Sequence, residues 1–196
     1  MGTPSTINVN ALIAAASRNA TDDGLPPVHL WHPERCADMD IEILSDGRWL
    51  HDGHPITRPA LVKLFSTILR KDKDGCTYLV TPVEKVKVRV ARAPFIATSV
   101  QVQGEGTDQT LFFTTNVDDV VQCGPERPLR VQTDPKTLQP MPFVMVRHGL
   151  EALISRSVFY QLVDMAVEHD LGEGAQLGVW SDGAFFALGP PGIHHD

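Results

Sequence analysis

Two segments of the sequence begin in the same way, with Ile, a hydroxyl residue and Arg, and each continues as an apolar stripe. The first is residues 56–65, ITRPALVKLF, and the second is residues 154–163, ISRSVFYQLV. Each predicts an amphipathic helix, the first running to about residue 70 and the second to about residue 169. Their recurrence limits the fold to one that uses a similar helical unit twice.

Strand-like runs flank both helices, and Asp-Gly pairs join several of them. Residues 41–44 and 48–51 enclose a turn with Asp46-Gly47, and residues 177–181 and 184–188 enclose another with Asp182-Gly183. Asp-Gly supplies the positive φ values that a tight hairpin needs. The run YLVTPVEKVKVRV at residues 78–90 predicts a further hairpin that turns at 82–85.

Three more strand candidates lie between the helical units and have short connections, which favour antiparallel pairing. Because the order strand, helix, hairpin recurs in residues 41–90 and 129–188, we predict an internal structural repeat. The predicted fold is α+β, with two interlocked, curled antiparallel β units of the β-roll type, each carrying one principal helix. The predicted segments are an N-terminal helix and linker (1–25), the first unit (26–93), the second unit (94–190) and a disordered tail (191–196).

The charge and cysteine content narrow the function classes. Seventeen basic against twenty-four acidic residues give a net charge of −7, which opposes binding to nucleic acid. The three cysteines include no Cys-x-x-Cys pair, so neither a disulfide framework nor a zinc site is indicated. No apolar run approaches the ~20 residues needed to cross a bilayer. We therefore expect a cytoplasmic protein that does not interact with membranes.

The Ile-hydroxyl-Arg signature suggests an anion site at each helix start. Thr57 and Ser155 are placed to cap the helices, and Arg58 and Arg156 follow them. Helix N-termini favour anions, and Arg binds an oxyanion at two points. In the alternative interpretation each Arg braces the sheet through an ion pair with an internal carboxylate. The candidate carboxylates are Asp40, Glu84 and Glu151.

A second candidate polar site combines Glu84 and Lys85 with His51 as an acid and base group. Neighbouring residues on a strand face opposite sides, which weakens this interpretation. The histidines near residues 29–54 lack a spacing that fixes metal geometry, so we predict neither a metal nor a cofactor. GEGTDQ, at residues 104–109, is interpreted as a hairpin loop, and the three tryptophans as core or interface residues.

Seven blocks of the sequence occur in this order: LPPVHLWHP, MDIEILSDGRW, PITRPALVKLFSTIL, YLVTPVEKVKVRVARAPF, NVDDVVQCGPERPLR, GLEALISRSVFYQLV and GVWSDGAFF. Together they closely resemble a bacterial family of uncharacterised proteins known as domain of unknown function 1285. The resemblance implies a two-part, mostly antiparallel fold with repeated motifs in a bacterial cytoplasmic protein, with no established activity and a role in signalling under consideration. It identifies no catalytic residues.

Together these features favour a non-catalytic binding or regulatory module for a small anionic ligand or a protein partner. One alternative is an enzyme of hydrolase type that uses Glu84, Lys85 and a nearby His such as His51. A second is a structural interaction protein whose exposed sheet edges pair in a homodimer. A ligand site requires polar groups that converge in one pocket, whereas an interaction protein requires an exposed apolar patch.

Overall fold

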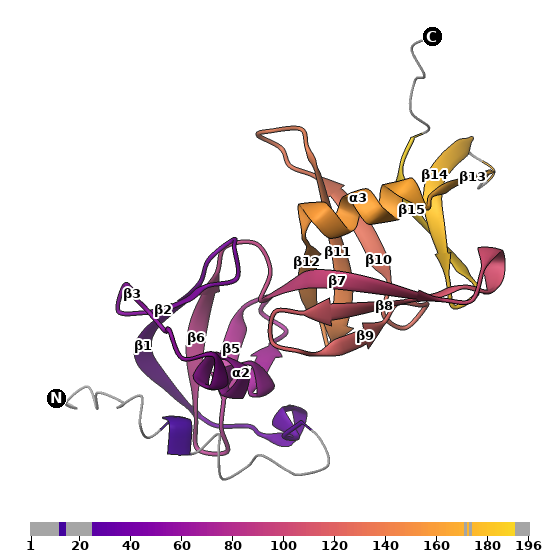
Figure 1. Ribbon diagram of the computed structural model, residues 1–196. Helices are drawn as coiled ribbons and strands as arrows, with labels where there is room; N and C mark the ends of the chain where they lie inside the picture. Colours follow the sequence, from indigo (N-terminus) through magenta and orange to yellow (C-terminus); the bar gives the residue numbers. More distant parts are fainter. Residues whose placement is uncertain (1–11, 15–24, 171, 173, 191–196) are drawn as a thin grey trace, which may run out of the picture. The chain divides into compact units, whose positions relative to one another are not determined.

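The computed structural model describes residues 12–14, 25–170, 172 and 174–190. The chain divides into two compact units, unit 1 (Met1–Pro94) and unit 2 (Phe95–Asp196). Each contains a six-stranded curled sheet and few helices, as Figure 1 shows. The predicted α+β class is confirmed, while the β-roll shape and the interlocking of the units stay predictions.

The sheet of unit 1 has the strand order β3-β2-β1-β6-β5-β4. The predicted hairpin around Asp46-Gly47 joins β1 to β2, where Ile43 pairs with Trp49, and Gly47 adopts a φ of 83°. The predicted hairpin of residues 78–90 joins β5 to β6. The elements are η1 (Val28–Leu30), β1 (Arg35–Ile43), β2 (Trp49–His51), β3 (His54–Pro55), α2 (Pro59–Thr67), β4 (Leu69–Lys71), β5 (Thr77–Val80) and β6 (Glu84–Val90).

The core of unit 1 forms where alternating strand residues meet the helix. Phe65 of α2 is fully buried and lies against Trp49 of β2, with 6.2 Å between the ring centroids. Aromatic rings of this size dominate the apolar area that a small core buries. Helix α2 is therefore held to the sheet through its apolar face. The other buried side chains around them include Ile41, Ile43, Ile68, Leu69, Leu79, Val80, Val86 and Val88.

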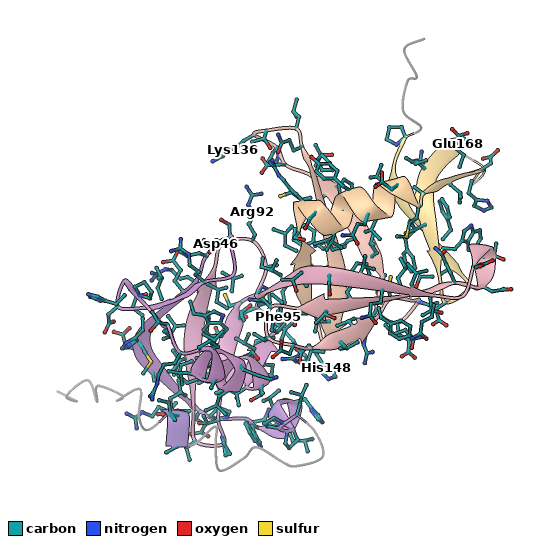
Figure 2. All side chains as sticks on the ribbon, in the orientation of Figure 1. Asp46, Arg92, Phe95, Lys136, His148 and Glu168 are labelled. Atoms are coloured by element: carbon teal, nitrogen blue, oxygen red, sulfur yellow. The ribbon has the colours of Figure 1, made fainter. Side chains whose placement is uncertain are left out.

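Unit 2 contains a six-stranded sheet in the order β10-β11-β12-β7-β8-β9 and a separate three-stranded sheet, β13-β14-β15. Figure 2 labels Phe95, the buried first residue of β7. The elements are β7 (Phe95–Gln103), η2 (Gly106–Asp108), β8 (Thr110–Thr115), β9 (Val120–Gln122), β10 (Leu129–Thr133), β11 (Pro140–Arg147), β12 (Leu150–Ile154), α3 (Arg156–Asp164), β13 (Val167–Asp170), β14 (Ala175–Ser181) and β15 (Ala184–Gly189).

One buried serine ties the small sheet to the large one. The Leu111 amide of β8 donates to Ser181 Oγ at 2.9 Å, and Ser181 Oγ donates to the Cys123 carbonyl at 2.7 Å. A buried hydroxyl that is satisfied in both directions fixes the relative position of the groups it joins. Helix α3 buries Val158 and Leu162, and the Asp-Gly hairpin predicted near residue 182 joins β14 to β15.

Both helices are shorter than predicted. Helix α2 ends at Thr67 and α3 at Asp164, and the apolar residues that continue each stripe lie in strands instead. Leu69 pairs with Leu79 in β4, and Val167 pairs with Gly178 in β13. The apolar residues at the end of each stripe can belong to a helix or to a strand. Backbone hydrogen bonds with a neighbouring strand favour the strand here.

The predicted antiparallel units are mostly but not entirely antiparallel, because each six-stranded sheet contains one parallel pair, β1 with β6 and β7 with β12. In each sheet this pair joins two three-stranded antiparallel meanders, so the orders β3-β2-β1-β6-β5-β4 and β9-β8-β7-β12-β11-β10 are equivalent. Helix α2 lies between β3 and β4, whereas α3 follows β12. The predicted repeat of 41–90 and 129–188 requires the two helices to occupy equivalent positions in the strand order. The helices do not occupy such positions.

The predicted N-terminal helix and linker lie mostly outside the described residues, as does the predicted tail of residues 191–196. Of the N-terminal segment the structure describes residues 12–14, which are helical, with Leu12 fully buried. Within the part of the chain that the structure describes, no helix has the length and apolar character to span a membrane.

Candidate functional site

The predicted cap and brace of α2 are not formed. Arg58, rather than Thr57, occupies the N-cap position, and the cap has no side-chain hydrogen bond. Thr57 lies one position too early, because the chain turns helical only at Pro59. Both Thr57 and Arg58 are exposed. The predicted ionic partners of Arg58 pair elsewhere, Asp40 with Arg89 at 2.5 Å and Glu84 with Arg35 at 4.0 Å.

The start of α3 agrees better with the prediction from the sequence. Ser155 occupies the N-cap position, and its Oγ accepts from the Val158 amide at 3.4 Å, as predicted. Arg156 is exposed and donates from Nη2 to Gln139 Oε1 at 2.8 Å, so the predicted carboxylate brace is absent here. The carboxylate proposed for that brace, Glu151, instead accepts two hydrogen bonds of 2.6 Å from Arg130.

Glu84, Lys85 and His51 do not converge. Glu84 is buried and lies opposite Arg35 at the start of the β1–β6 pair, whereas Lys85 donates to Asp72 at 2.9 Å. The strand register places His51 opposite Ile41, which pairs with Val88 further along β6. These three side chains therefore do not form the acid and base site that the sequence suggested.

Lys85 belongs to a different cluster, which sequence reasoning missed. Arg70 donates to Asp72 Oδ1 at 2.6 Å, and its Nη1 donates to the carbonyls of Val28 at 2.7 Å and Trp31 at 2.6 Å. The side chains of Arg70, Asp72 and Lys85 are 15%, 17% and 25% exposed. Partial burial alone would raise the pKa of Asp72, but the hydrogen bonds from Arg70 and Lys85 together hold it below 3.8. The cluster fixes η1 against β4.

Tyr78 extends this cluster. Its hydroxyl donates to Asp74 Oδ2 at 2.7 Å, and Lys85 Nζ lies 4.2 Å from the centre of its ring. The hydrogen bond to Asp74 and partial burial both raise the pKa of Tyr78. Each charged side chain of the cluster is paired within the protein, which indicates a brace rather than a reactive site. Among the described residues, no group of three or more His, Cys, Asp or Glu side chains is arranged to hold a metal ion.

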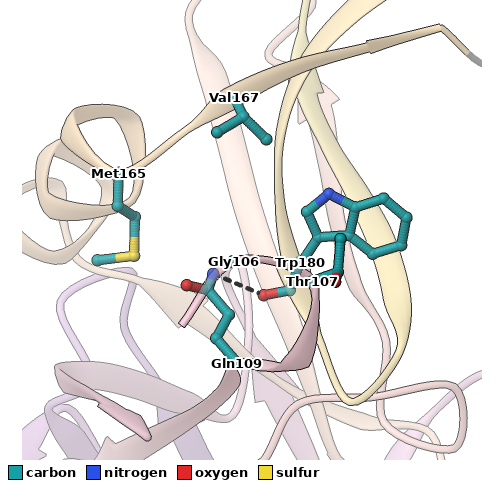
Figure 3. A pocket seen from close by; sticks show the side chains of 6 residues that line it. All are labelled: Gly106, Thr107, Gln109, Met165, Val167 and Trp180. Carbon is teal, nitrogen blue, oxygen red and sulfur yellow. Dashed lines mark hydrogen bonds between the residues drawn. The ribbon is translucent and has the colours of Figure 1, made fainter. Parts of the chain in front are cut away.

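Unit 2 contains a pocket of about 300 Å³ between η2, the end of α3 and the small sheet. Met165 follows α3, Val167 belongs to β13 and Trp180 to β14. Figure 3 shows their side chains around the pocket. These three side chains make the lining mainly apolar. The remaining lining residues are Gly106, Thr107 and Gln109.

Gln109 supplies a fixed polar group to the pocket. Its Nε2 donates to the Trp180 carbonyl at 2.8 Å. A carbonyl oxygen only accepts, so this bond determines which end of the amide carries the nitrogen. Oε1 therefore points away from Trp180, on the side where Met165 lies in Figure 3. The pocket offers an acceptor at Gln109 and a hydroxyl at Thr107.

An aromatic cluster supports the Trp180 wall. The ring centroids of His169 and Phe185 lie 5.0 Å and 5.4 Å from that of Trp180, and they lie 4.9 Å from each other. Gly178 leaves room for this packing, because a Cβ there would come within 2.5 Å of Phe185 Cζ. The indole is thus positioned by its neighbours in the small sheet.

The sequence contains only weak signals for this pocket. The segment around Thr107 was interpreted as a simple hairpin loop, and Trp180 as a core or interface residue. Trp180 is only partly buried, unlike the fully buried Trp49. The partial exposure of Trp180 and its place beside the glycine-containing loop cannot be read from the sequence, because only the fold brings these two segments together.

Comparison with protein families identifies both parts of the chain. Residues 26–93 match the N-terminal domain of DUF1285, described as a domain of unknown function, and residues 94–188 match the C-terminal domain of the same family. The chain belongs to the DUF1285 family. The resemblance seen in the sequence is confirmed.

Two solved structures of DUF1285 proteins are similar to this one. A family member from Silicibacter pomeroyi DSS-3 is 46% identical, covers 91% of this chain and 95% of its own, and gives a TM-score of 0.82. A family member from Shewanella baltica OS155 is 22% identical, covers 64% of this chain and 91% of its own, and gives a TM-score of 0.50, which supports the fold alone. Comparison with curated proteins found no match.

Proposed function

We propose that this DUF1285 protein is a non-catalytic module that binds a small molecule in the unit 2 pocket. The observation that carries the proposal is the pocket itself, in which Met165, Val167 and Trp180 provide apolar walls and Gln109 provides an oriented acceptor. Mainly apolar pockets with a few fixed polar groups are the usual form of small-molecule sites. At about 300 Å³ the pocket suits a small ligand.

The enzyme alternative has less support. Catalysis requires a nucleophile or base within hydrogen-bond reach of a reacting atom, with a neighbouring group to orient it. Glu84, Lys85 and His51 lie apart, and Lys85 is engaged with Asp72. The pocket lining contains no titratable side chain. A binding function therefore accounts for the geometry with fewer assumptions.

A regulatory or signalling role in the bacterial cytoplasm forms part of this proposal. A module that binds without reaction changes the stability or the contacts of the folded state, and both changes can be transmitted to a partner. Cys36, Cys76 and Cys123 are free thiols, which suits a reducing compartment.

A fragment screen tests the proposed function. We would screen soluble fragments by ligand-detected NMR against the wild type and Val167→Trp, in which the larger side chain occupies the pocket. Val167 is 47% exposed on the edge strand β13, so the strand accepts a large aromatic residue. The matched control is Val120→Trp, because Val120 is also exposed, at 66%, on the edge strand β9.

The expected result is a set of fragments that bind the wild type and Val120→Trp but not Val167→Trp. Equal binding to all three proteins would place the site elsewhere and overturn the proposal. The absence of any binding fragment would overturn it as well.

A homodimeric interaction protein is a second candidate. Helix α3 exposes two apolar side chains, Tyr160 at 63% and Val163 at 38%, which lie on one side of a helix at i, i+3 spacing. Sedimentation velocity of the wild type and of Tyr160→Asp tests this candidate. A dimer that the substitution dissociates supports it, and a wild-type monomer at all concentrations refutes it.

A further inference from the structure

The two segments that build the pocket contain no positively charged Lys or Arg. The residues from Phe95 to Glu126 include neither residue type, and the same holds from Ser157 to Asp196. All the residues that line the pocket come from these two segments. The Lys and Arg residues of unit 2 are all confined to residues 127–156 between them.

Carboxylates, by contrast, adjoin the lining residues directly in the sequence. Each of them is exposed, and Figure 2 labels Glu168, which lies on the opposite face of β13 from Val167 and His169. Exposed charges of one sign around a pocket raise the local concentration of ligands with the opposite charge. The four are Glu105, Asp108, Asp164 and Glu168, next to Gly106, Thr107, Met165 and Val167 respectively.

The lining has the chemistry that receives a cation with an apolar body. An indole attracts an ammonium group to its face more strongly than the other aromatic side chains do. The thioether of Met165 is polarizable and adapts to irregular apolar shapes. The free acceptor, Gln109 Oε1, suits a ligand that donates a hydrogen bond.

We propose that the pocket binds a small organic cation, an ammonium group carried on an apolar body, with Trp180 as its main contact. This inference rests on the binding function proposed above and names its ligand class. It differs from the anionic ligand that the helix starts suggested, because the charged residues adjoining the lining residues in the sequence are all acidic. The small volume of about 300 Å³ favours a ligand of choline size over a larger one.

Three probes of similar shape test whether the pocket prefers a positively charged ligand. They are choline, its uncharged carbon isostere 3,3-dimethylbutan-1-ol and the anion 3,3-dimethylbutanoate. We expect choline to bind the wild type about fivefold more tightly than the alcohol, the ratio that a typical cation–π contact provides. The anion should bind most weakly. NMR titrations at low ionic strength measure all three, because salt screens the exposed carboxylates.

Charge variants then test the carboxylates. Asp164→Asn and Asp108→Asn should each reduce the preference for choline over the alcohol, with little effect on the binding of the alcohol. Both residues are exposed, so these variants should fold normally. Asp38→Asn is the matched control, because it removes one exposed carboxylate from unit 1. It should leave the preference unchanged.

The outcomes separate the ligand class from the binding function. The proposal is supported if the two pocket variants show a smaller preference for choline over the alcohol than the wild type does, while Asp38→Asn shows the same preference as the wild type. Equal affinity for choline and the alcohol, tighter binding of the anion, or binding of other fragments but none of the three probes refutes the cation while the binding function stands. If no fragment binds in a manner that Val167→Trp abolishes, the binding function itself fails.

Discussion

Replacing Asp72 by Asn should destabilise unit 1 more than the same replacement at an exposed ion pair. Asp72 accepts from Arg70 at 2.6 Å and from Lys85 at 2.9 Å, and its side chain is 17% exposed. Hydrogen bonds to charged groups contribute about 1.5–3 kcal/mol each. Asn keeps one acceptor oxygen, and solvent screens partly exposed ion pairs. We therefore expect the free energy of unfolding to fall by about 2 kcal/mol.

The control for this substitution is Asp46→Asn. Asp46 accepts from Arg48 at 2.7 Å. The two residues are two positions apart in the sequence, as are Arg70 and Asp72. Asp46 lies in the turn labelled in Figure 2, where its side chain is 51% exposed. An exposed pair of this kind contributes little to stability, so the control should cause a much smaller loss.

Urea unfolding followed by tryptophan fluorescence measures both variants, since Trp49 is buried in unit 1. The sign of the pH dependence follows from the pKa of Asp72, which is lower in the folded state than its ordinary value of 3.8. The stabilisation is therefore fully present above about pH 4 and is lost as the pH falls through the folded pKa. The wild type and Asp72→Asn should differ at neutral pH and converge in acid.

Equal shifts of the urea midpoint in Asp72→Asn and Asp46→Asn would show that the partly buried pair of Asp72 stabilises unit 1 no more than an exposed pair does. A difference between the wild type and Asp72→Asn that persists well below the ordinary pKa of an aspartate would show that the ionised carboxylate is not its cause.

Three further predictions concern single side chains. Ser155→Ala should lower the free energy of unfolding by about 0.5–1 kcal/mol because it removes the α3 cap, whereas Thr57→Ala should have little effect; urea midpoints measure both. Burial raises the pKa of Cys123 to about 12, so a thiol reagent near pH 8 should modify the exposed Cys36 and leave Cys123 unmodified until the protein unfolds. If an anion binds at α3, phosphate should raise the melting temperature of the wild type more than that of Arg156→Lys; an equal response in both proteins argues against it.

The local parts of the fold are predictable from the sequence because short-range chemistry determines them. The Asp-Gly turns are examples, since Gly47 and Gly183 adopt φ values of 83° and 71°, which favour glycine. Ser155 is another example, since a serine just before an apolar stripe is a common cap. The prediction failed at Thr57, where the proline that follows delays the helix start.

The long-range parts could not be predicted in this way. The parallel pair of β1 and β6 joins residues from opposite ends of unit 1, and no short connection indicates it. Leu69 and Val167 continue their helical stripes in the sequence, yet strand partners fix them in β4 and β13. The pocket depends on contacts of the same kind, since Thr107 and Trp180 are far apart in the sequence and line the same pocket in the folded chain.

The ¹H–¹⁵N NMR spectrum of the labelled protein during a choline titration shows whether the unit 2 pocket binds an organic cation. The indole N–H of Trp180, assigned by comparison with Trp180→Phe, reports on the pocket wall, and the amides of Gly106 and Val167 report on its two sides. We expect saturable shifts at these three positions that the isosteric alcohol produces only at higher concentration. Saturable shifts confined to other residues, or no shift at the Trp180 indole, would rule out this pocket as the cation site.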